Sequence, residues 1–152
     1  MTSLQDRITF RRVTENDIHI LVEIERESFA VPWPADAFYH DIQHNRFAAY
    51  IMIELDCQVA GYCGVWIILD EAHITNIAIL PKYRGMKLGE VLLAKVMDVA
   101  KETGAMSMTL EVRVSNDVAK ALYKKLGFQD GGIRRNYYTD NGEDARVMWV
   151  NL

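Results

Sequence analysis

Six residues, from Arg84 to Gly89, combine two basic side chains with two glycines just before a predicted helix. The apolar residues that follow have the spacing of one helix face; they are Leu88, Val91, Leu92, Val96, Val99 and Ala100. The first backbone N–H groups of a helix have no partner inside it, and the helix dipole adds about half a positive charge there. Glycines let a ligand approach the backbone closely, while Arg84 and Lys87 add positive charge. The segment therefore predicts a site for a phosphate or pyrophosphate group.

Two common phosphate-binding motifs do not match this segment. The P-loop requires Gly-Lys-Ser/Thr where its helix begins, and the dinucleotide fingerprint requires Gly-x-Gly-x-x-Gly. Neither pattern occurs in the chain. A glycine-containing turn that only precedes a surface helix is the ordinary alternative for so short a pattern, so the interpretation depends on the rest of the chain.

Glu111 and Tyr123 are the side chains whose types could move protons beside such a site. Glu111 lies in an alternating stretch, 107–114, that predicts a strand after the long helix, and Tyr123 lies on the helix that follows. A carboxylate can accept a proton, directly or through a water, and a phenol can donate one. The ordinary alternatives are a strand carboxylate paired with a lysine and a core tyrosine with its hydroxyl at the rim.

Strands and helices alternate along the chain without a repeat, a linker or a low-complexity segment. The expected strands are 8–13, 47–55, 58–69, 72–80, 107–114, 128–138 and 145–151. The expected helices are one from Thr14 to Ser28, a short one after Pro34, the long one that ends before Gly104, and one capped by Ser115 or Asn116 that ends at Gly127. The pattern predicts one domain over residues 1–152.

Composition narrows the class of protein. The chain has 152 residues, of which 50% are hydrophobic and 25% charged, with a net charge of −4. This charge argues against nucleic-acid binding and is consistent with a basic substrate. No apolar run approaches membrane-spanning length and no signal peptide is recognisable, so we expect a cytoplasmic protein that does not bind membranes. Cys57 and Cys63 lack metal-type spacing and are expected to be free thiols.

The four histidines, His19, His40, His44 and His73, are scattered, so no metal site is expected. His73 has no partner that the sequence identifies. It is expected to be an ordinary surface or core residue.

The segment 84–89 resembles the acetyl-CoA loop of the GNAT N-acetyltransferases, whose pattern is Gln/Arg-x-x-Gly-x-Gly/Ala. Arg84, Gly89 and the residues between them fit, except that Lys87 stands where the first glycine is expected. The element order βααβββαβαββ is similar to the whole GNAT fold, an α/β fold with a mixed, mostly antiparallel central sheet and helices on both faces. The resemblance implies acetyl-CoA as co-substrate, with the backbone of the fourth strand pairing with its pantetheine arm. The implied binding residues are Ile77, Ala78, Ile79, Arg84, Gly85, Met86, Lys87, Leu88, Gly89, Glu90 and Asn116.

Further segments are together similar to the bacterial ribosomal-protein alanine N-acetyltransferases, the RimI type. They are Phe29 with Pro32 and Trp33, and residues 76–79, 110–116, 121–123, 126–128 and 133–138. The resemblance implies Glu111 as proton acceptor and Tyr123 as proton donor. It also implies an enzyme that acetylates the N-terminal alanine of the eighteenth small-subunit ribosomal protein; we expect this enzyme to be a monomer. Trp33, Tyr137 and Tyr138 are expected to line the groove for this acceptor.

Two alternatives remain open from the sequence. One is a GNAT enzyme for other protein N-termini, a lysine or a small amine. The other is a non-catalytic acyl-CoA-binding module, which the presence of both Glu111 and Tyr123 disfavours.

Overall fold

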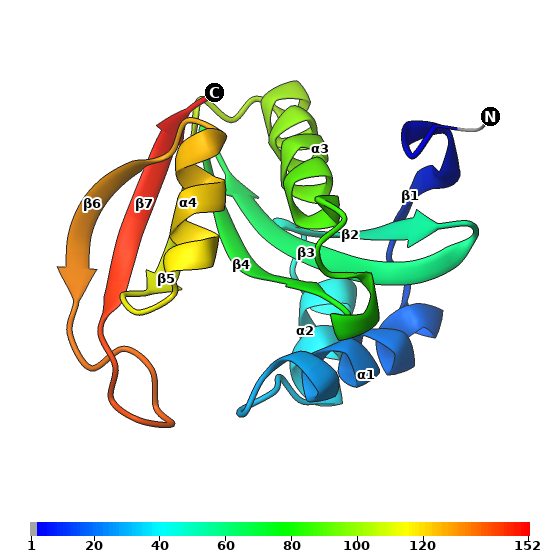
Figure 1. Cartoon of the computed structure of the whole chain (residues 1–152), viewed down its shortest axis with the longest axis horizontal. Helices are drawn as coiled ribbons and strands as arrows, with labels where there is room; N and C mark the ends of the chain where they lie inside the picture. Colours follow the sequence, from blue (N-terminus) through cyan, green and yellow to red (C-terminus); the bar gives the residue numbers. More distant parts are fainter. Residues whose placement is uncertain (1–2) are drawn as a thin grey trace.

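The computed structural model describes residues 3–152, which form one sheet with helices packed on both of its faces (Figure 1). In these residues the strands are β1 (Ile8–Arg12), β2 (Ala48–Leu55), β3 (Gln58–Ile68), β4 (Glu71–Ile79), β5 (Ser107–Arg113), β6 (Gln129–Arg134) and β7 (Ala145–Asn151). The helices are α1 (Ile18–Ser28), α2 (Ala35–His44), α3 (Leu88–Thr103) and α4 (Asp117–Lys125), with 3-10 turns η1 (Gln5–Arg7), η2 (Glu15–Asp17) and η3 (Pro81–Tyr83). The strand order is β1-β2-β3-β4-β5-β7-β6, and only β4 and β5 pair in parallel. The predicted order of elements and the mixed, mostly antiparallel sheet are confirmed.

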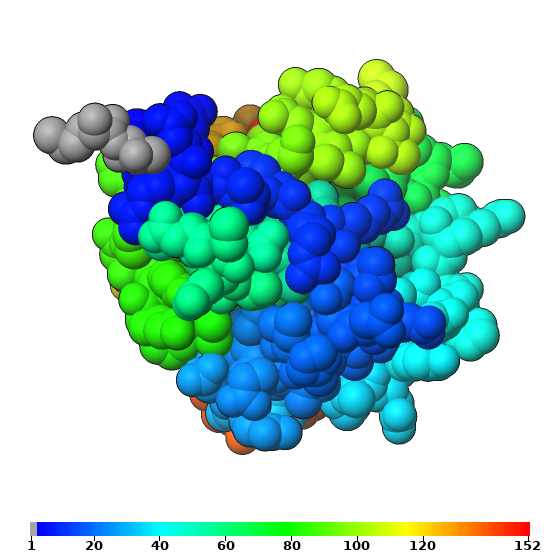
Figure 2. All heavy atoms as spheres, turned by 90° about the vertical axis from the view of Figure 1, so that its right-hand side faces the viewer, coloured from blue at the N-terminus to red at the C-terminus, as the bar shows by residue number. Residues whose placement is uncertain are grey.

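Helices α1 and α2 cover one face of the sheet. The chain enters α1 through a turn in which the Asp17 carboxylate accepts hydrogen bonds from the backbone N–H and the hydroxyl of Thr14, at 2.9 and 3.1 Å. Phe38 of α2 is fully buried and packs edge-on against Tyr50 of β2 and Tyr62 of β3. In the space-filling view of the side where β1 lies, α1 and α2 form the lower part of the surface and α3 lies at the top (Figure 2).

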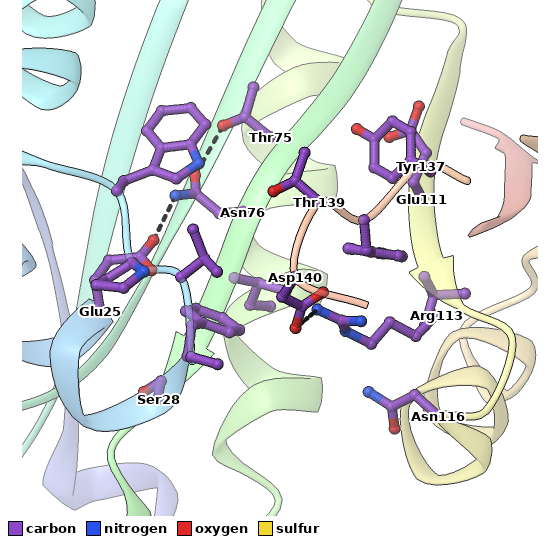
Figure 3. Close-up of a pocket in the computed structure, with 18 of the residues that line it drawn as sticks. Glu25, Ser28, Thr75, Asn76, Glu111, Arg113, Asn116, Tyr137, Thr139 and Asp140 are labelled. Atoms are coloured by element: carbon purple, nitrogen blue, oxygen red, sulfur yellow. Dashed lines mark hydrogen bonds and ion pairs between the residues drawn. The ribbon is translucent and has the colours of Figure 1, made fainter. Parts of the chain in front are cut away.

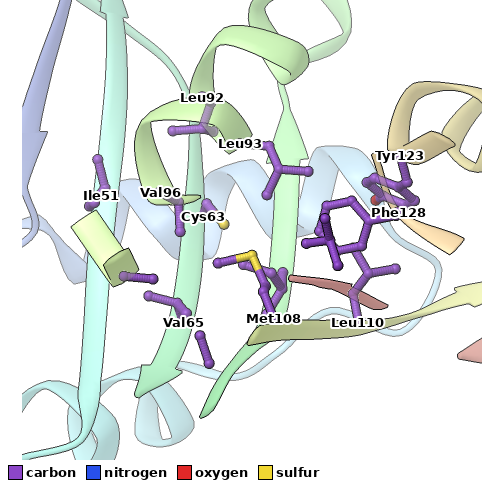
Figure 4. Packing of buried hydrophobic residues seen from close by; sticks show 14 of the residues in the cluster. Ile51, Cys63, Val65, Leu92, Leu93, Val96, Met108, Leu110, Tyr123 and Phe128 are labelled. Atoms are coloured by element: carbon purple, nitrogen blue, oxygen red, sulfur yellow. The ribbon is translucent and has the colours of Figure 1, made fainter. Parts of the chain in front are cut away.

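Helices α3 and α4 cover the opposite face. Leu92, Leu93 and Val96 of α3 are fully buried and pack with Cys63 of β3 and Met108 of β5 (Figure 4). The period of these apolar residues is the one that predicted the helix. The helix ends at Gly104, whose φ of 110° is in the left-handed region that glycine adopts without strain.

Strands β4 and β5 are paired over only three residues each, Glu71 to His73 with Ser107 to Thr109. Beyond these pairs the two strands diverge (Figure 1). A bulge in β4 lies at the same point: Gly64 of β3 is opposite Asn76 and Val65 is opposite Ile74, so Thr75 has no residue opposite it. The divergence interrupts the sheet near its centre.

Strand β6 is shorter than the sequence predicted. The strand expected over 128–138 ends at Arg134, so Tyr137 and Tyr138 lie in the loop between β6 and β7 instead of in a strand. The ladder ends with Arg134 opposite Ala145, and Asn136 has a φ of 53°, which is incompatible with an extended strand. In the described part of the chain, no helix is long and apolar enough to cross a membrane.

Candidate active site

The diverging strands open a cavity of about 880 Å³ (Figure 3). Its walls come from α1 and the connection between α1 and α2, from β4, from β5 and α4, and from the loop between β6 and β7. The cavity brings together side chains that the sequence singled out in separate segments: Trp33, Ile77, Glu111, Asn116, Tyr123, Tyr137 and Tyr138. Four segments that are distant in the sequence therefore share one site.

The Glu111 carboxylate lies at the wall of this cavity, with its side chain only 9% exposed. Its Oε2 atom is 2.6 Å from Nε2 of His73, and its Oε1 atom is 3.6 Å from Nε of Arg134. His73, for which the sequence identified no partner, thus directly contacts the predicted base. The contact depends on the parallel pairing of β4 with β5, which no local sequence pattern indicates.

Tyr123 lies on α4 and packs against Phe128, with 5.9 Å between the ring centroids. It lines the cavity, and its hydroxyl forms no hydrogen bond with any residue in the described range, 3–152. Burial raises the pKa of Tyr123 well above its ordinary value. The phenol therefore stays protonated at neutral pH and can donate a hydrogen bond to a group that enters the cavity.

Asn116 is the N-cap of α4. It is one of the two residues that the sequence predicted for this position. Its Oδ1 atom accepts a hydrogen bond from the backbone N–H of Ala119 at 3.1 Å. The side chain also lines the cavity, and its amide nitrogen has no hydrogen-bond acceptor among residues 3–152. Capping the helix thus leaves the amide N–H groups available.

The segment 84–89 lies outside the cavity lining and follows the end of β4. Arg84 donates a hydrogen bond from Nε to the backbone carbonyl of Ile79 at 3.1 Å, which joins this segment to the strand. A Cβ atom at Gly89 would lie 3.7 Å from Leu122 of α4 and 3.8 Å from Ile79, so α3 begins between β4 and α4. Glu90 of α3 also forms an ion pair with Lys125 of α4, at 3.1 Å. The start of α3 is thus at the α4 side of the diverging strands.

Lys87 is the N-cap of α3 and has a φ of 63°. This is the left-handed conformation that a glycine adopts without strain. Lys87 therefore adopts a conformation that favours glycine, the residue that the family pattern has at this position. The Lys87 side chain lines a separate shallow groove beside Glu90, Lys95 and Asp98.

The edge of β4 that faces β5 has no ladder partner in the described residues beyond His73. Backbone N–H and C=O groups from Ile74 to Ile79 on this edge are therefore not used by the sheet. An unpaired strand edge is suited to an extended ligand that hydrogen-bonds like an added strand. Ile77, Ala78 and Ile79 lie on this part of β4.

Glu25 is a site residue that the sequence did not identify. It is 1% exposed on α1 and lines the cavity. Tyr62 donates a hydrogen bond from its hydroxyl to Oε1 of Glu25, and Asn76 donates one from Nδ2 to the same oxygen at 2.8 Å. Burial raises the pKa of Glu25, although these hydrogen bonds oppose the shift. A charged residue four positions after the buried Leu21, on an otherwise apolar helix face, is the signal that could have identified it.

The Glu25 network continues to the bulge in β4. Oδ1 of Asn76 accepts a hydrogen bond from the hydroxyl of Thr75 at 2.9 Å. The two bulge residues are thus fixed by a carboxylate on α1. Figure 3 shows this group on the wall opposite Glu111 and Tyr137.

Aromatic and acidic side chains complete the cavity. Trp33 packs against Phe38 with 5.6 Å between the ring centroids, and the rings of Tyr137 and Tyr138 are nearly perpendicular at 5.1 Å. The charged residues of the lining are four carboxylates and one guanidinium; they are Glu25, Glu111, Asp140, Glu143 and Arg113. The cavity therefore favours a cationic ligand.

Comparison with known proteins agrees with this geometry. Residues 18–128 match the acetyltransferase (GNAT) family. A Bacillus subtilis (strain 168) protein, provisionally named ribosomal protein bS18-alanine N-acetyltransferase, is 52% identical over 149 residues, which cover 98% of this chain and 99% of that protein. The ribosomal protein bS18-alanine N-acetyltransferase of Escherichia coli (strain K12) is 36% identical over 142 residues, 92% of this chain and 95% of that protein.

A solved structure also matches. The crystal structure of the ribosomal-protein-S18-alanine N-acetyltransferase from Escherichia coli has a TM-score of 0.87 at 34% identity, and the match covers 95% of this chain and 93% of that one. The family match, these relatives and the sheet that opens between β4 and β5 lead to one conclusion: the chain belongs to the GNAT family of acetyltransferases.

Proposed function

We propose that this protein transfers the acetyl group of acetyl-CoA to the α-amino group of a protein N-terminus, with the N-terminal alanine of ribosomal protein bS18 as the acceptor. The observation that carries the proposal is that Glu111 and Tyr123 line the same cavity where β4 and β5 diverge. The names of relatives that align along nearly the whole chain support the choice of acceptor. An acceptor of this kind assigns the reaction to the cytoplasm.

Acetyl-CoA binding would use the features at the α3 and α4 side of the cavity. The pantetheine arm would pair with the free edge of β4 at Ile77, Ala78 and Ile79, and would receive a hydrogen bond from the amide of Asn116. The pyrophosphate would bind backbone N–H groups at the start of α3, within the segment from Arg84 to Glu90. The Glu90 side chain is paired with Lys125, so its contribution would come from the backbone.

The transfer forms a C–N bond and breaks the C–S bond of the thioester. The α-amino group, with a pKa of about 8, must first lose a proton, which Glu111 would accept directly or through a water. Backbone N–H groups at the β4 bulge would stabilise the negative charge that develops on the carbonyl oxygen. Tyr123 would donate its proton to the departing thiolate and regain one from solvent.

The acceptor would enter between the α1–α2 connection and the β6–β7 loop. Trp33, Tyr137 and Tyr138 would line its path, and the carboxylates of the cavity would attract a free α-ammonium group on a basic segment. Proteins that bind RNA, such as ribosomal proteins, commonly have basic segments of this kind. The charge of the cavity thus supports a basic N-terminus over a neutral small amine.

A thiol-release assay with three peptides tests the acceptor. The first peptide carries the N-terminal sequence of bS18 beginning with alanine, the second is the same peptide with a blocked α-amino group, and the third carries an internal lysine. We expect turnover with the first peptide only. Turnover with the blocked or lysine peptide would identify another amine as acceptor, and binding of acetyl-CoA without turnover of any amine would identify a non-catalytic module. Intact-mass measurement of bS18 from cells with and without the gene tests the same acceptor in vivo.

A further inference from the structure

Strand β5 presents two charged side chains on the cavity side, because its residues alternate between the two faces of the sheet. Leu110 and Val112 are buried and belong to the core on one face, whereas Glu111 and Arg113 lie on the other; all four residues contribute to the cavity lining, and Glu111 and Arg113 are its charged members on β5. The proposed function assigns a proton-transfer role to Glu111 only. Arg113 has no role in that mechanism.

The Arg113 guanidinium is bound by four residues of one loop, the 135–144 loop that connects β6 to β7. Its Nη2 atom is 2.9 Å from Oδ2 of Asp140, and its Nη1 atom is 3.2 Å from Oε1 of Glu143 and 3.2 Å from Oδ1 of Asn141. Its Cζ atom lies 4.0 Å from the centroid of the Tyr138 ring. A planar guanidinium with five N–H donors can make these contacts together, and an ammonium cannot.

The same loop carries two of the aromatic side chains of the proposed acceptor groove. Tyr138 contacts Arg113 itself, and Tyr137 packs against Tyr138. The loop is otherwise fixed at its base, where the backbone N–H of Ser115 donates to Oε2 of Glu143 at 2.9 Å. Arg113 is the contact from β5 that fixes the part of the loop around Asp140.

We propose that Arg113 is a positioning residue that fixes the 135–144 loop relative to Glu111 and thereby sets the shape of the acceptor groove. This inference rests on the proposed function for its kinetic consequence. Glu111 and Arg113 are two residues apart on one strand. Because Arg113 binds the loop, β5 would fix the distance between the Glu111 carboxylate and the tyrosines of the loop. Loss of Arg113 would weaken acceptor binding and leave the acetyl-CoA site unchanged.

The direction of the kinetic effect separates positioning from simple electrostatics. Arg113→Met removes the guanidinium that, among residues 3–152, lines the acidic cavity, so a purely electrostatic effect would strengthen binding of a cationic acceptor and lower its KM. Loss of the loop contacts predicts the opposite, a roughly tenfold or larger increase in the acceptor KM. The KM for acetyl-CoA should change less than about twofold.

Two further variants complete the kinetic test. Arg113→Lys keeps the charge but loses the planar contacts, so we expect an intermediate acceptor KM, whereas a charge effect alone would give the wild-type value. Arg135→Met removes the same charge from the loop itself, at a side chain that is 83% exposed and whose ion-pair partner, Asp144, lies 3.9 Å away. This control should change the acceptor KM less than about twofold.

Hydrogen exchange provides a test that does not depend on the acceptor. The N–H groups of Tyr138 and Gly142 form hydrogen bonds within the loop, at 3.1 and 2.8 Å. Both should exchange faster in Arg113→Met than in the wild type and in Arg135→Met. Kinetics are measured with whichever amine the wild-type enzyme acetylates.

The two proposals fail in different ways. If the wild type does not acetylate an N-terminal α-amino group, the proposed function fails. If exchange in the loop is unchanged in Arg113→Met, or if the acceptor KM stays constant or falls, the role of Arg113 is overturned.

Discussion

The Nε2 atom of His73, the last residue of β4 in the β4–β5 ladder, lies 2.6 Å from Oε2 of Glu111, two residues beyond the ladder on β5. In the ladder His73 is opposite Thr109, so its ring extends toward the next residue on the same face of β5. The contact restricts the carboxylate that we propose as the base. A rotation of this carboxylate would change the distance to an amine in the cavity.

We expect His73→Phe to lower kcat by up to about 100-fold, because a base displaced by about 1 Å loses much of its efficiency. His73→Gln should recover part of the loss, since its amide can still donate a hydrogen bond to Glu111. The KM for acetyl-CoA should stay near its wild-type value in both variants. Steady-state kinetics check this, with His19→Phe on the exposed side of α1 as control. Wild-type kcat in His73→Phe would show that the contact has no part in catalysis.

Glu111→Gln and Tyr123→Phe should each lower turnover by roughly 10²–10⁴-fold with little change in acetyl-CoA binding. The Glu111 variant should recover partly at high pH, where more of the acceptor amine is already neutral. The Tyr123 variant should not recover, because its defect is in protonating the thiolate.

The stability of the Tyr123 variant provides a second measurement. The Tyr123 hydroxyl has no partner in residues 3–152, so Tyr123→Phe should unfold at the wild-type temperature. Turnover against pH, with Tyr39→Phe as control, decides the roles. An undiminished rate in either variant would leave that side chain with a packing role alone.

Lys87→Gly and Lys87→Met separate charge from backbone strain. Both remove a positive charge at the start of α3, so both should raise the KM for acetyl-CoA, since a charge-assisted contact contributes about 1.5–3 kcal/mol. Only the glycine removes the strain of the left-handed φ, which stabilises the folded state by about 1–2 kcal/mol. The greater flexibility of glycine in the unfolded chain costs about 0.4–1 kcal/mol of this gain. The glycine variant should therefore have the larger free energy of unfolding of the two. A lower KM in Lys87→Gly alone would show that backbone freedom matters more than charge at this position.

The raised pKa of Glu25 predicts that the difference in stability between the wild type and Glu25→Gln depends on pH. Burial raises its pKa in the folded state, so its favourable contribution is present below the ordinary value near 4.5 and is lost as pH rises through the raised pKa. Glu25→Gln does not titrate and can still accept hydrogen bonds from Tyr62 and Asn76. The free energy of unfolding of this variant, relative to wild type, should therefore increase as pH rises from about 4 to about 7.

Denaturant unfolding at several pH values measures this difference, with the exposed Glu23→Gln on the same helix as control. Glu25→Leu should instead be destabilised by about 1–3 kcal/mol for each donor left without a partner. Parallel pH curves for Glu25→Gln and the wild type would contradict the raised pKa.

The elements of this fold follow from local patterns, and for that reason the sequence predicted them. The buried face of α3 repeats with the helical period, Gly104 ends the helix with a positive φ, and Asn116 caps α4 through its own side chain. Each of these signals depends on residues within one turn. The end of β6 is the exception, because the alternation continues to Tyr138 while the pairing partners on β7 stop at Ala145.

The contacts of the site depend on which strands become neighbours. Glu111 and Tyr123 could be named from residue type and family pattern, but the His73 contact requires the parallel register of β4 and β5. Glu25 likewise meets Asn76 across 51 positions of sequence. Tyr138 likewise meets Arg113 across 25 positions of sequence, through a contact between guanidinium and ring that carries no sequence periodicity.

The short ladder between β4 and β5 has a consequence for the stability of the protein. Three residue pairs join β4 to β5, fewer than join any other two neighbouring strands of the described sheet. An acetyl-CoA molecule bound between these two strands would connect the two halves of the sheet. At a concentration 100 times its Kd, it would stabilise the folded state by about 2.7 kcal/mol. Without acetyl-CoA, local opening between β4 and β5 would be more frequent by the same free energy.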